Sequence, residues 1–184
     1  MFNKLICIYL SKKCRHFLLG ENIRFRNRNP FYIHKAGDIK IGDNVVFNNK
    51  TRQNPVGLFK KTSIFIGEDA SLTIGKNTGL SGVSIYCSKE IEIGSYCNIG
   101  GNVMIFDTDF HPLDYKARRI HKFEEIRSKG ISIGDDVFIG ANSIIMKGVT
   151  IGNKSILGAG SVLTKNMPSN EIWGGNPARL IRKI

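Results

Sequence analysis

Cysteine, long apolar runs and secretion signals are scarce or missing in this chain of 184 residues. Its four cysteines form no Cys-x-x-Cys pair, so a zinc or redox centre has little support and no metal is expected. No apolar run approaches the roughly 20 residues of a membrane-spanning helix. Lys and Arg interrupt residues 1–20, which also lack a small-residue cleavage site, so we expect no signal peptide and a cytoplasmic location. Small buried hydrophobic side chains are expected at Cys7, Cys14, Cys87 and Cys97.

The C-terminal third of the chain repeats with a period of six. Neither a strand, with a period of two, nor a helix, with a period of 3.6, produces this spacing. A chain that turns a corner every six residues does, and three such blocks make one triangular coil. Coils stack about 4.8 Å apart, like parallel strands, so each corner aliphatic packs on the one eighteen residues later. The repeating aliphatic residues are Ile133, Ile139, Ile145, Ile151, Leu157 and Leu163.

The same pattern occurs earlier in the chain with interruptions. Ile93, Ile99 and Ile105 form one further coil at strict spacing. Upstream, steps of 19 from Phe47 to Ile66 and from Ile74 to Ile93 each indicate one coil plus one residue. We therefore predict an all-β solenoid, a parallel β-helix of hexapeptide repeats over residues 36–184, with a short C-terminal tail.

Positive charge is concentrated at the N-terminus. Residues 1–35 hold eight Lys and Arg against Glu21 alone, which is +7 of the total net charge of +12. The apolar residues between these charges predict a short amphipathic helix, forming a basic N-terminal segment separate from the solenoid. It could cap the open first coil, lie on an anionic membrane or pack on a neighbouring subunit. Nucleic acid is not an expected partner, because no module interleaves aromatic residues with the charge.

The repeat stops after Ile105 and resumes at Ile133, leaving an excursion at residues 106–130. Long loops on compact domains are usually functional or disordered. A histidine among carboxylates can be held in one tautomer and made more basic, which suits a general base. His111 is the candidate here, whereas His16, His34 and His121 are interpreted as surface residues. The polar residues that open the excursion are Asp107, Thr108, Asp109, His111 and Asp114.

The hexapeptide run, the segment DTDFHPLDYKARR and the closing GGNPARLIRKI together resemble the hexapeptide-repeat O-acetyltransferases. Within them, the chain is most similar to the branch of maltose, galactoside and surface-polysaccharide acetyltransferases. The resemblance covers roughly residues 36–184. It implies a left-handed parallel β-helix, a homotrimer with active sites between subunits, and acetyl-CoA as the donor. The acceptor it implies is a hydroxyl of a sugar or of a lipid-linked saccharide.

The resemblance also implies roles for individual residues. His111 corresponds to the catalytic base, and Asp109 or Asp114 could orient it or bind sugar hydroxyls. A backbone N–H of Gly140 or Ala141 is the expected oxyanion donor. The implied contacts to coenzyme A are Phe138 and Ala159 beside the pantetheine arm, Thr164 and Lys165 near the nucleotide, and Arg179, Arg182 and Lys183 at the phosphates.

The acceptor pocket departs from the maltose and galactoside enzymes. Where the maltose and galactoside enzymes carry an acceptor-binding Asn, this chain has Ser81 or Gly82. We therefore expect Ser81 to contact the acceptor, and we expect the same of Asp107 in the excursion. The acceptor favoured by this departure is a polysaccharide precursor. An antibiotic or serine acceptor is the alternative within the acetyltransferases. Outside them, a non-catalytic scaffold and a zinc carbonic anhydrase remain alternatives, the latter needing three histidines at one site.

Overall fold

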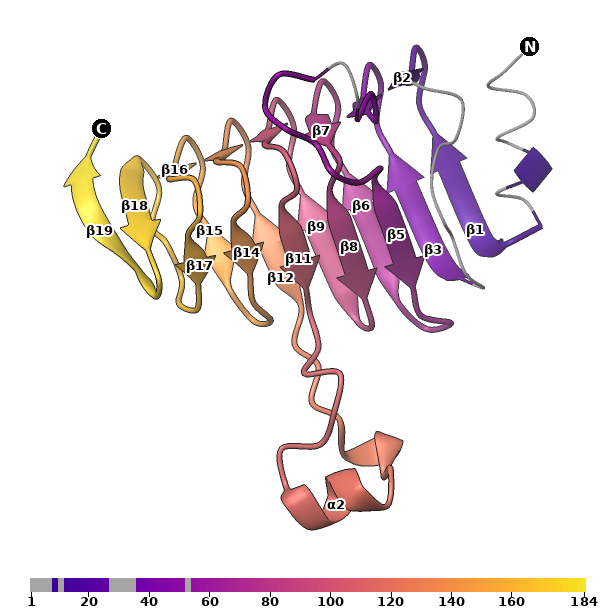
Figure 1. The fold of residues 1–184 in the computed structure, drawn as a ribbon. Helices are drawn as coiled ribbons and strands as arrows, with labels where there is room; N and C mark the ends of the chain where they lie inside the picture. The colour runs from indigo at the N-terminus through magenta and orange to yellow at the C-terminus, as the bar shows by residue number, and fades with distance from the viewer. Residues whose placement is uncertain (1–7, 10–11, 27–35, 52–53) are drawn as a thin grey trace.

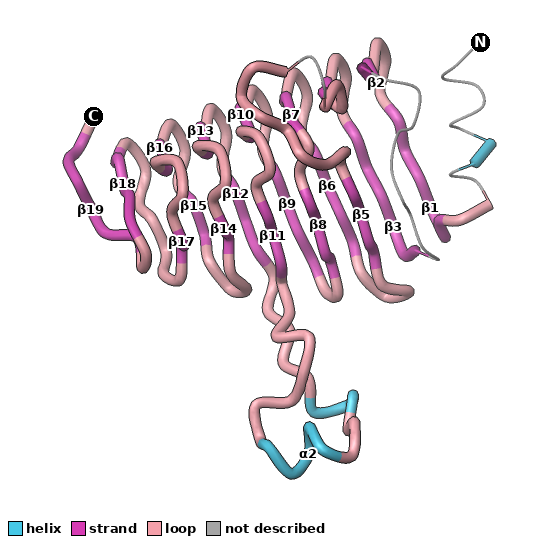
Figure 2. Tube along the Cα trace, viewed as in Figure 1, coloured by secondary structure: helices cyan, strands magenta, loops and turns pink. Residues whose placement is uncertain are grey.

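The computed structural model describes residues 8–9, 12–26, 36–51 and 54–184. Three sheets form the faces of an elongated prism, and from β3 to β17 the chain passes from sheet A to sheet B to sheet C in each coil (Figure 1). Short turns separate most of the strands, and two longer excursions interrupt them (Figure 2). The sheets are almost wholly parallel; the exception is the pair β18–β19 at the C-terminal end. The predicted solenoid of stacked coils is therefore confirmed.

The strands of each sheet follow the order of the stack. Sheet A contains β1 (Cys14–Leu19), β3 (Ala36–Ile41), β6 (Ser71–Ile74), β9 (Glu90–Ile93), β12 (Ile131–Ile133) and β15 (Thr150–Ile151). Sheet B contains β2 (Arg24–Arg26), β4 (Val46–Asn48), β7 (Gly79–Ser81), β10 (Asn98–Ile99), β13 (Phe138–Ile139), β16 (Ile156–Leu157), β18 (Glu171–Gly175) and β19 (Ala178–Lys183). Sheet C contains β5 (Ser63–Ile66), β8 (Ser84–Cys87), β11 (Met104–Phe106), β14 (Ile144–Ile145) and β17 (Val162–Leu163).

The period-six residues stack as their spacing predicts. Ile133 pairs with Ile151 on sheet A, Ile139 with Leu157 on sheet B, and Ile145 with Leu163 on sheet C. All six side chains are buried, and they form the C-terminal part of one continuous apolar core. At the corners, residues such as Asn44 and Asp136 adopt the left-handed conformation, with φ of 57° each, which turns the chain toward the next face.

One predicted register is wrong. The step from Phe47 to Ile66 is not one coil plus one residue, because Phe47 lies on sheet B and pairs with Leu80, whereas Ile66 lies on sheet C. The described residues between β4 and β5, 49–51 and 54–62, belong to a second excursion. Asn102 secures this excursion, donating to Gly57 O at 3.1 Å and accepting from Phe59 N at 3.3 Å.

The helix predicted for the N-terminal segment is wrong for residues 14–26. These residues form β1 and β2, which pair in parallel with β3 and β4 and end sheets A and B. Phe17, which was expected on the apolar face of that helix, packs against the core together with Leu19 and Phe25, whereas Leu18, expected on the same face, is 66% exposed. Residues 1–7 and 27–35, including His34 and Lys35, lie outside the described residues.

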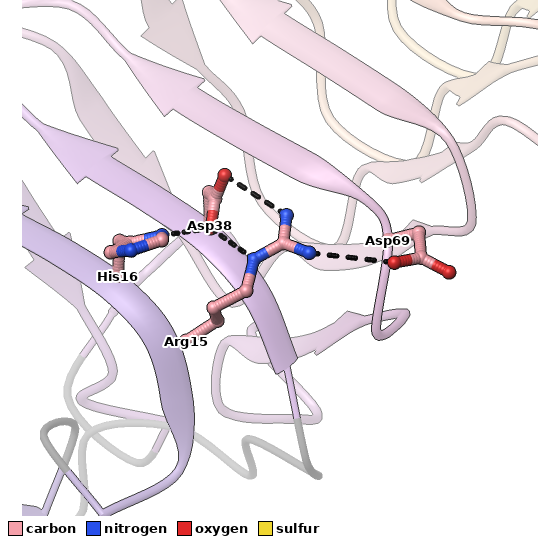
Figure 3. Close-up of polar contacts among 4 residues, drawn as sticks. All are labelled: Arg15, His16, Asp38 and Asp69. Carbon is pink, nitrogen blue, oxygen red and sulfur yellow. Dashed lines mark hydrogen bonds and ion pairs between the residues drawn. The ribbon is translucent and has the colours of Figure 1, made fainter.

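An ion-pair cluster ties β1 to its neighbours (Figure 3). The Arg15 guanidinium donates to both carboxylate oxygens of Asp38, at 3.0 and 3.2 Å, and to Asp69 at 3.4 Å. His16 Nδ1 lies 3.0 Å from Asp38 Oδ1. The hydrogen bonds from Arg15, and then from His16, lower the pKa of Asp38 to about 2.

The cysteines that the structure describes are buried thiols. Cys14, Cys87 and Cys97 are free and belong to the core, which confirms their predicted hydrophobic role. Burial raises the pKa of each thiol, so none is primed as a nucleophile. Cys7 lies outside the described residues. No helix in the described ranges is long and apolar enough to cross a bilayer.

Candidate active site

The catalytic excursion leaves sheet C after β11 and returns to sheet A at β12. Its base is a short antiparallel ladder: Lys129 N donates to Asp107 O at 2.8 Å, and Asp109 N donates to Arg127 O at 3.1 Å. Thr108 and Ser128 form a bridge between the two limbs. The loop head therefore stands on a hydrogen-bonded stalk rather than on a free tether (Figure 2).

Asp107 anchors this stalk to the preceding coil. Its side chain is fully buried and accepts hydrogen bonds from three backbone amides, those of Ser88 at 2.6 Å, Lys89 at 2.7 Å and Glu90 at 3.0 Å. Both carboxylate oxygens are thus occupied by the turn after β8. The expected acceptor contact from Asp107 is wrong, because the residue is structural and does not reach the surface.

His111 faces solvent and follows Phe110, whose backbone conformation is constrained. Phe110 has φ of 62°, a conformation that a bulky side chain rarely adopts. Its ring packs edge-on against Tyr86, with ring centroids 4.7 Å apart, and against Phe106 at 5.2 Å. Pro112, the residue after His111, is buried. His111 itself is exposed, and its ring has no hydrogen-bond partner among the described residues, so it is open to a substrate.

The two carboxylates expected beside His111 have other partners. Asp109 Oδ1 pairs with Lys147 Nζ at 3.1 Å, and its Oδ2 is buried without a hydrogen-bond partner in the described structure. Asp114 caps the helix α2 (Tyr115–Arg119) by accepting from Ala117 N at 2.9 Å. The expectation that either carboxylate orients the His111 ring is therefore not met in this chain. The sequence also did not predict the ion pair between Lys147 and Asp109.

The head of the excursion carries an uncovered apolar surface. Beyond α2 the chain makes one short 3-10 turn, Phe123–Glu125, and Arg118 ties the head together by donating to the carbonyls of Pro112 and Leu113. Large apolar side chains remain exposed by half or more here, an arrangement typical of a surface that another protein covers. They are Leu113, Tyr115, Ile120 and Phe123.

The outer face of sheet B aligns the residues expected to contact the donor. Strand pairing places Phe138 beside Ile156, Ile156 beside Ile172, and Ile172 beside Arg182. Phe138 is 46% exposed and Arg182 is exposed, so both point outward. These four residues, named here the donor row, span three strand spacings, or about 14 Å. Arg179 lies on β19 beside Gly174, at the same end of the sheet.

A line of glycines runs beside the donor row. Gly100, Gly140, Gly158 and Gly174 each follow the buried residue of a sheet B strand, in consecutive coils. We call them the glycine row. A Cβ at Gly140 would collide with the backbone N of Ala159, so the coils approach too closely there for any side chain. The result is a strip of bare backbone along one side of the donor row.

The glycine row decides between the two expected oxyanion donors. The Gly140 N–H already donates to Leu157 O at 2.7 Å, so the expectation for Gly140 is wrong. In the described structure the amides of Ala141 and Ala159, the next residue in each coil, donate no hydrogen bond to the protein. The structure separates two other predicted contacts from this face: Thr164 and Lys165 follow β17 on sheet C.

A hollow of about 360 Å³ lies at the other end of the same face. Ser81 and Phe138, both expected at the site, line it together with Gly100. It also contains Arg26, Asn48 and Asn98, which sequence reasoning missed. Arg26 had been assigned to a helix, and only the strand register reveals that it joins the sheet B face.

His111 and this hollow occupy different sides of one chain. The excursion projects from the corner between sheets C and A, away from the strands of sheet B (Figure 1). A single chain therefore presents an open histidine on one side and a polar hollow with an aligned donor row on another. Within one chain, the exposed histidine and the polar hollow are therefore apart.

Comparisons with a family model and with known proteins support this description of the fold. A family model described as the hexapeptide repeat of succinyl-transferase matches residues 130–165. Protein CapG of Staphylococcus aureus is 38% identical over 130 residues, which cover 68% of this chain and 69% of CapG. The crystal structure of the hexapeptide-repeat acetyltransferase VCA0836 from Vibrio cholerae O1 biovar eltor, complexed with acetyl-CoA, is 27% identical with a TM-score of 0.63, covering 98% of this chain and 77% of that one.

A second solved structure, that of the polySia-specific acetyltransferase NeuO, is 25% identical with a TM-score of 0.67 and covers 92% of this chain and 77% of NeuO. Fold and site together define an acyltransferase built on a left-handed parallel β-helix. The chain belongs to the hexapeptide-repeat acetyltransferases, a family of acetyl-CoA-dependent enzymes. The family and the handedness expected from the sequence are thereby confirmed.

Proposed function

We propose that this enzyme transfers an acetyl group from acetyl-CoA to a sugar hydroxyl on a surface-polysaccharide precursor. The observation that carries the proposal is the alignment on sheet B, where Phe138 and Arg182 share one outward row beside the glycine row. The similarity to NeuO, a polySia-specific acetyltransferase, supports a saccharide acceptor.

The donor lies along the donor row in this proposal. The bare backbone of the glycine row accepts the extended pantetheine arm, and the open amides of Ala141 and Ala159 hydrogen-bond its polar groups. Arg182 and Arg179 meet the phosphates at the far end, where a guanidinium can bind two oxygens at once. Phe138 packs against the thioester end of the arm, because it lies at the opposite end of the row.

His111 provides the chemistry. An alcohol has a pKa far above 7, so its attack on a thioester requires a base to take the proton as the new C–O bond forms. The imidazole accepts this proton and then passes it to the sulfur as the C–S bond breaks, which leaves the ester and free coenzyme A. The Ala141 N–H stabilises the oxyanion between these steps. No covalent intermediate with the enzyme is needed.

Two copies of the chain complete each site. The His111 loop and the sheet B face diverge within one chain, and the loop head exposes Leu113, Tyr115, Ile120 and Phe123. In a closed homotrimer, each loop reaches the sheet B face of the neighbour and its head becomes covered. We further propose that the enzyme works in the cytoplasm, with its basic N-terminus near the inner face of the membrane.

Calorimetric titration with coenzyme A tests this function without knowledge of the acceptor. We expect saturable binding at one site per chain, weakened at least tenfold, or by about 1.4 kcal/mol, in Arg182→Ala. The matched control is Lys40→Ala, which removes an exposed charge from the outer face of sheet A. No binding at millimolar coenzyme A, or equal weakening in both variants, would contradict the proposal.

A further inference from the structure

The hollow at the N-terminal end of sheet B is a built arrangement of polar side chains. Strand pairing places Arg26 beside Asn48 and Asn48 beside Ser81, one from each of three successive strands. Asn98 enters from the next strand, β10, and Phe138 closes the end that adjoins the donor row. Its volume of about 360 Å³ is at the lower end of the usual range for ligand pockets, about 300–1,000 Å³.

The charge that lines the hollow is positive. Among the described residues that line it, Arg26 alone is charged, and no carboxylate faces it. The contrast with Arg15, eleven residues earlier, is direct: Arg15 is held by Asp38 and Asp69, whereas Arg26 has no ion-pair partner within the described structure. A cation left unpaired at the end of a polar hollow is available to an anionic ligand.

A second group in the hollow is also unsatisfied. Asn48 Oδ1 is buried and has no hydrogen-bond partner in the described structure. A buried acceptor left without a donor is unfavourable, and native proteins keep few of them. Asn48 follows Arg26 in the same row. Its oxygen is covered in the free chain, so the side chain must turn outward to meet a ligand that the guanidinium holds, with Ser81 and Asn98 beside them.

We propose that this hollow binds an acidic sugar unit of the acceptor, with Arg26 pairing with its anionic group. The inference rests on the proposed function and specifies its substrate class. A planar guanidinium matches a carboxylate in two-point geometry, while the amides and the hydroxyl of Asn48, Asn98 and Ser81 suit sugar hydroxyls. Because Phe138 lines both the hollow and the donor row, a sugar held here lies next to the acetyl group. The net charge of +12 attracts a polyanionic chain to the protein.

The test compares sugars that differ in one group. Saturation-transfer NMR with full-length protein and excess coenzyme A measures the binding of methyl glucuronide against methyl glucoside, and of methyl galacturonide against methyl galactoside. Glucose 6-phosphate distinguishes a phosphate from a carboxylate as the preferred anion. We expect each acidic sugar to bind at least tenfold more tightly than its neutral partner. Arg26→Gln should abolish this preference and Arg26→Lys should retain part of it.

Arg24→Gln is the matched control, because Arg24 lies on the same strand, is exposed and carries the same charge, but does not line the hollow. It should leave the acidic-to-neutral ratio unchanged. Equal loss in the Arg24 and Arg26 variants, or no acidic preference in the wild-type protein, would overturn the inference. If coenzyme A binds but acidic sugars do not, the inference fails and the proposed function stands. If acidic sugars bind through Arg26 but coenzyme A does not, the proposed function fails instead.

Discussion

Replacing Asp107 by Asn should destabilise the excursion without touching the substrate. The carboxylate accepts three amide hydrogen bonds, at 2.6, 2.7 and 3.0 Å, in a fully buried position. The two bonds to Lys89 and Glu90 share one oxygen, and the bond to Ser88 uses the other. In its less costly orientation, Asn therefore turns its NH₂ group toward the Ser88 N–H, and one hydrogen bond is lost. Hydrogen bonds to a charged group contribute about 1.5–3 kcal/mol each, so the substitution costs at least about 1.5–3 kcal/mol.

That minimum loss corresponds to a decrease in Tm of roughly 3–12 °C for a chain of this length. Calorimetry measures the decrease, and limited trypsin digestion at Arg118 and Arg119 shows whether the loop head opens first. Asp114→Asn is the control, because Asn also caps helices and the residue is exposed. If Asp107→Asn had wild-type stability but lost activity, the structural role would be refuted and the acceptor contact expected from the sequence would be restored.

Three further changes have distinct expected results. His111→Gln should lower kcat by about 10²–10⁴-fold with unchanged Tm, because the side chain is exposed and acts as the base; an unaltered kcat would exclude it as the base. Phe138→Ala should weaken coenzyme A binding by about 1–2 kcal/mol, with Phe138→Trp retaining affinity in the same titration; equal affinities would place the donor elsewhere. Because Arg15 lowers the pKa of Asp38 to about 2, the ion pair is fully formed above the ordinary carboxylate value and is lost as pH falls toward 2. The protection factors of residues 14–19, which compare each exchange rate with the intrinsic rate at the same pH, should fall in that window, and Asp38→Asn should abolish this fall.

The core of the fold could be predicted because one physical rule repeats there. Ile133 and Ile151 are eighteen residues apart and pair as predicted, since each coil must bury one aliphatic at each corner. Upstream the rule failed where spacing was ambiguous. A step of 19 from Phe47 to Ile66 fits one coil, yet the true partner of Phe47 is Leu80, and Ile66 lies on another face, where it pairs with Cys87. Spacing alone does not distinguish a coil from a loop of similar length.

The site was predictable to a similar degree. His111 stood out because it lies at the break in the repeat, and Phe138 and Arg182 came from resemblance. The burial of Asp107 was not predictable, because a run of polar residues gives no sign of which one accepts buried amides. Arg26 was hidden for another reason: its partners are 22 and 55 residues later in the chain, and only the register of β2, β4 and β7 brings them together.

Mixed trimers test the central claim, that His111 of one copy acts on the sheet B face of another. His111→Gln and Phe138→Asp each disable one half of the site, so each homotrimer should be inactive. Co-expression with different tags yields mixed trimers in which one junction pairs an intact loop with an intact face. We predict recovery of about a quarter of wild-type activity at random 1:1 assembly, because one site in three is restored in three trimers of four. Activity in tag-selected mixed trimers no higher than in the two inactive parents would contradict the account and place the whole site within one chain.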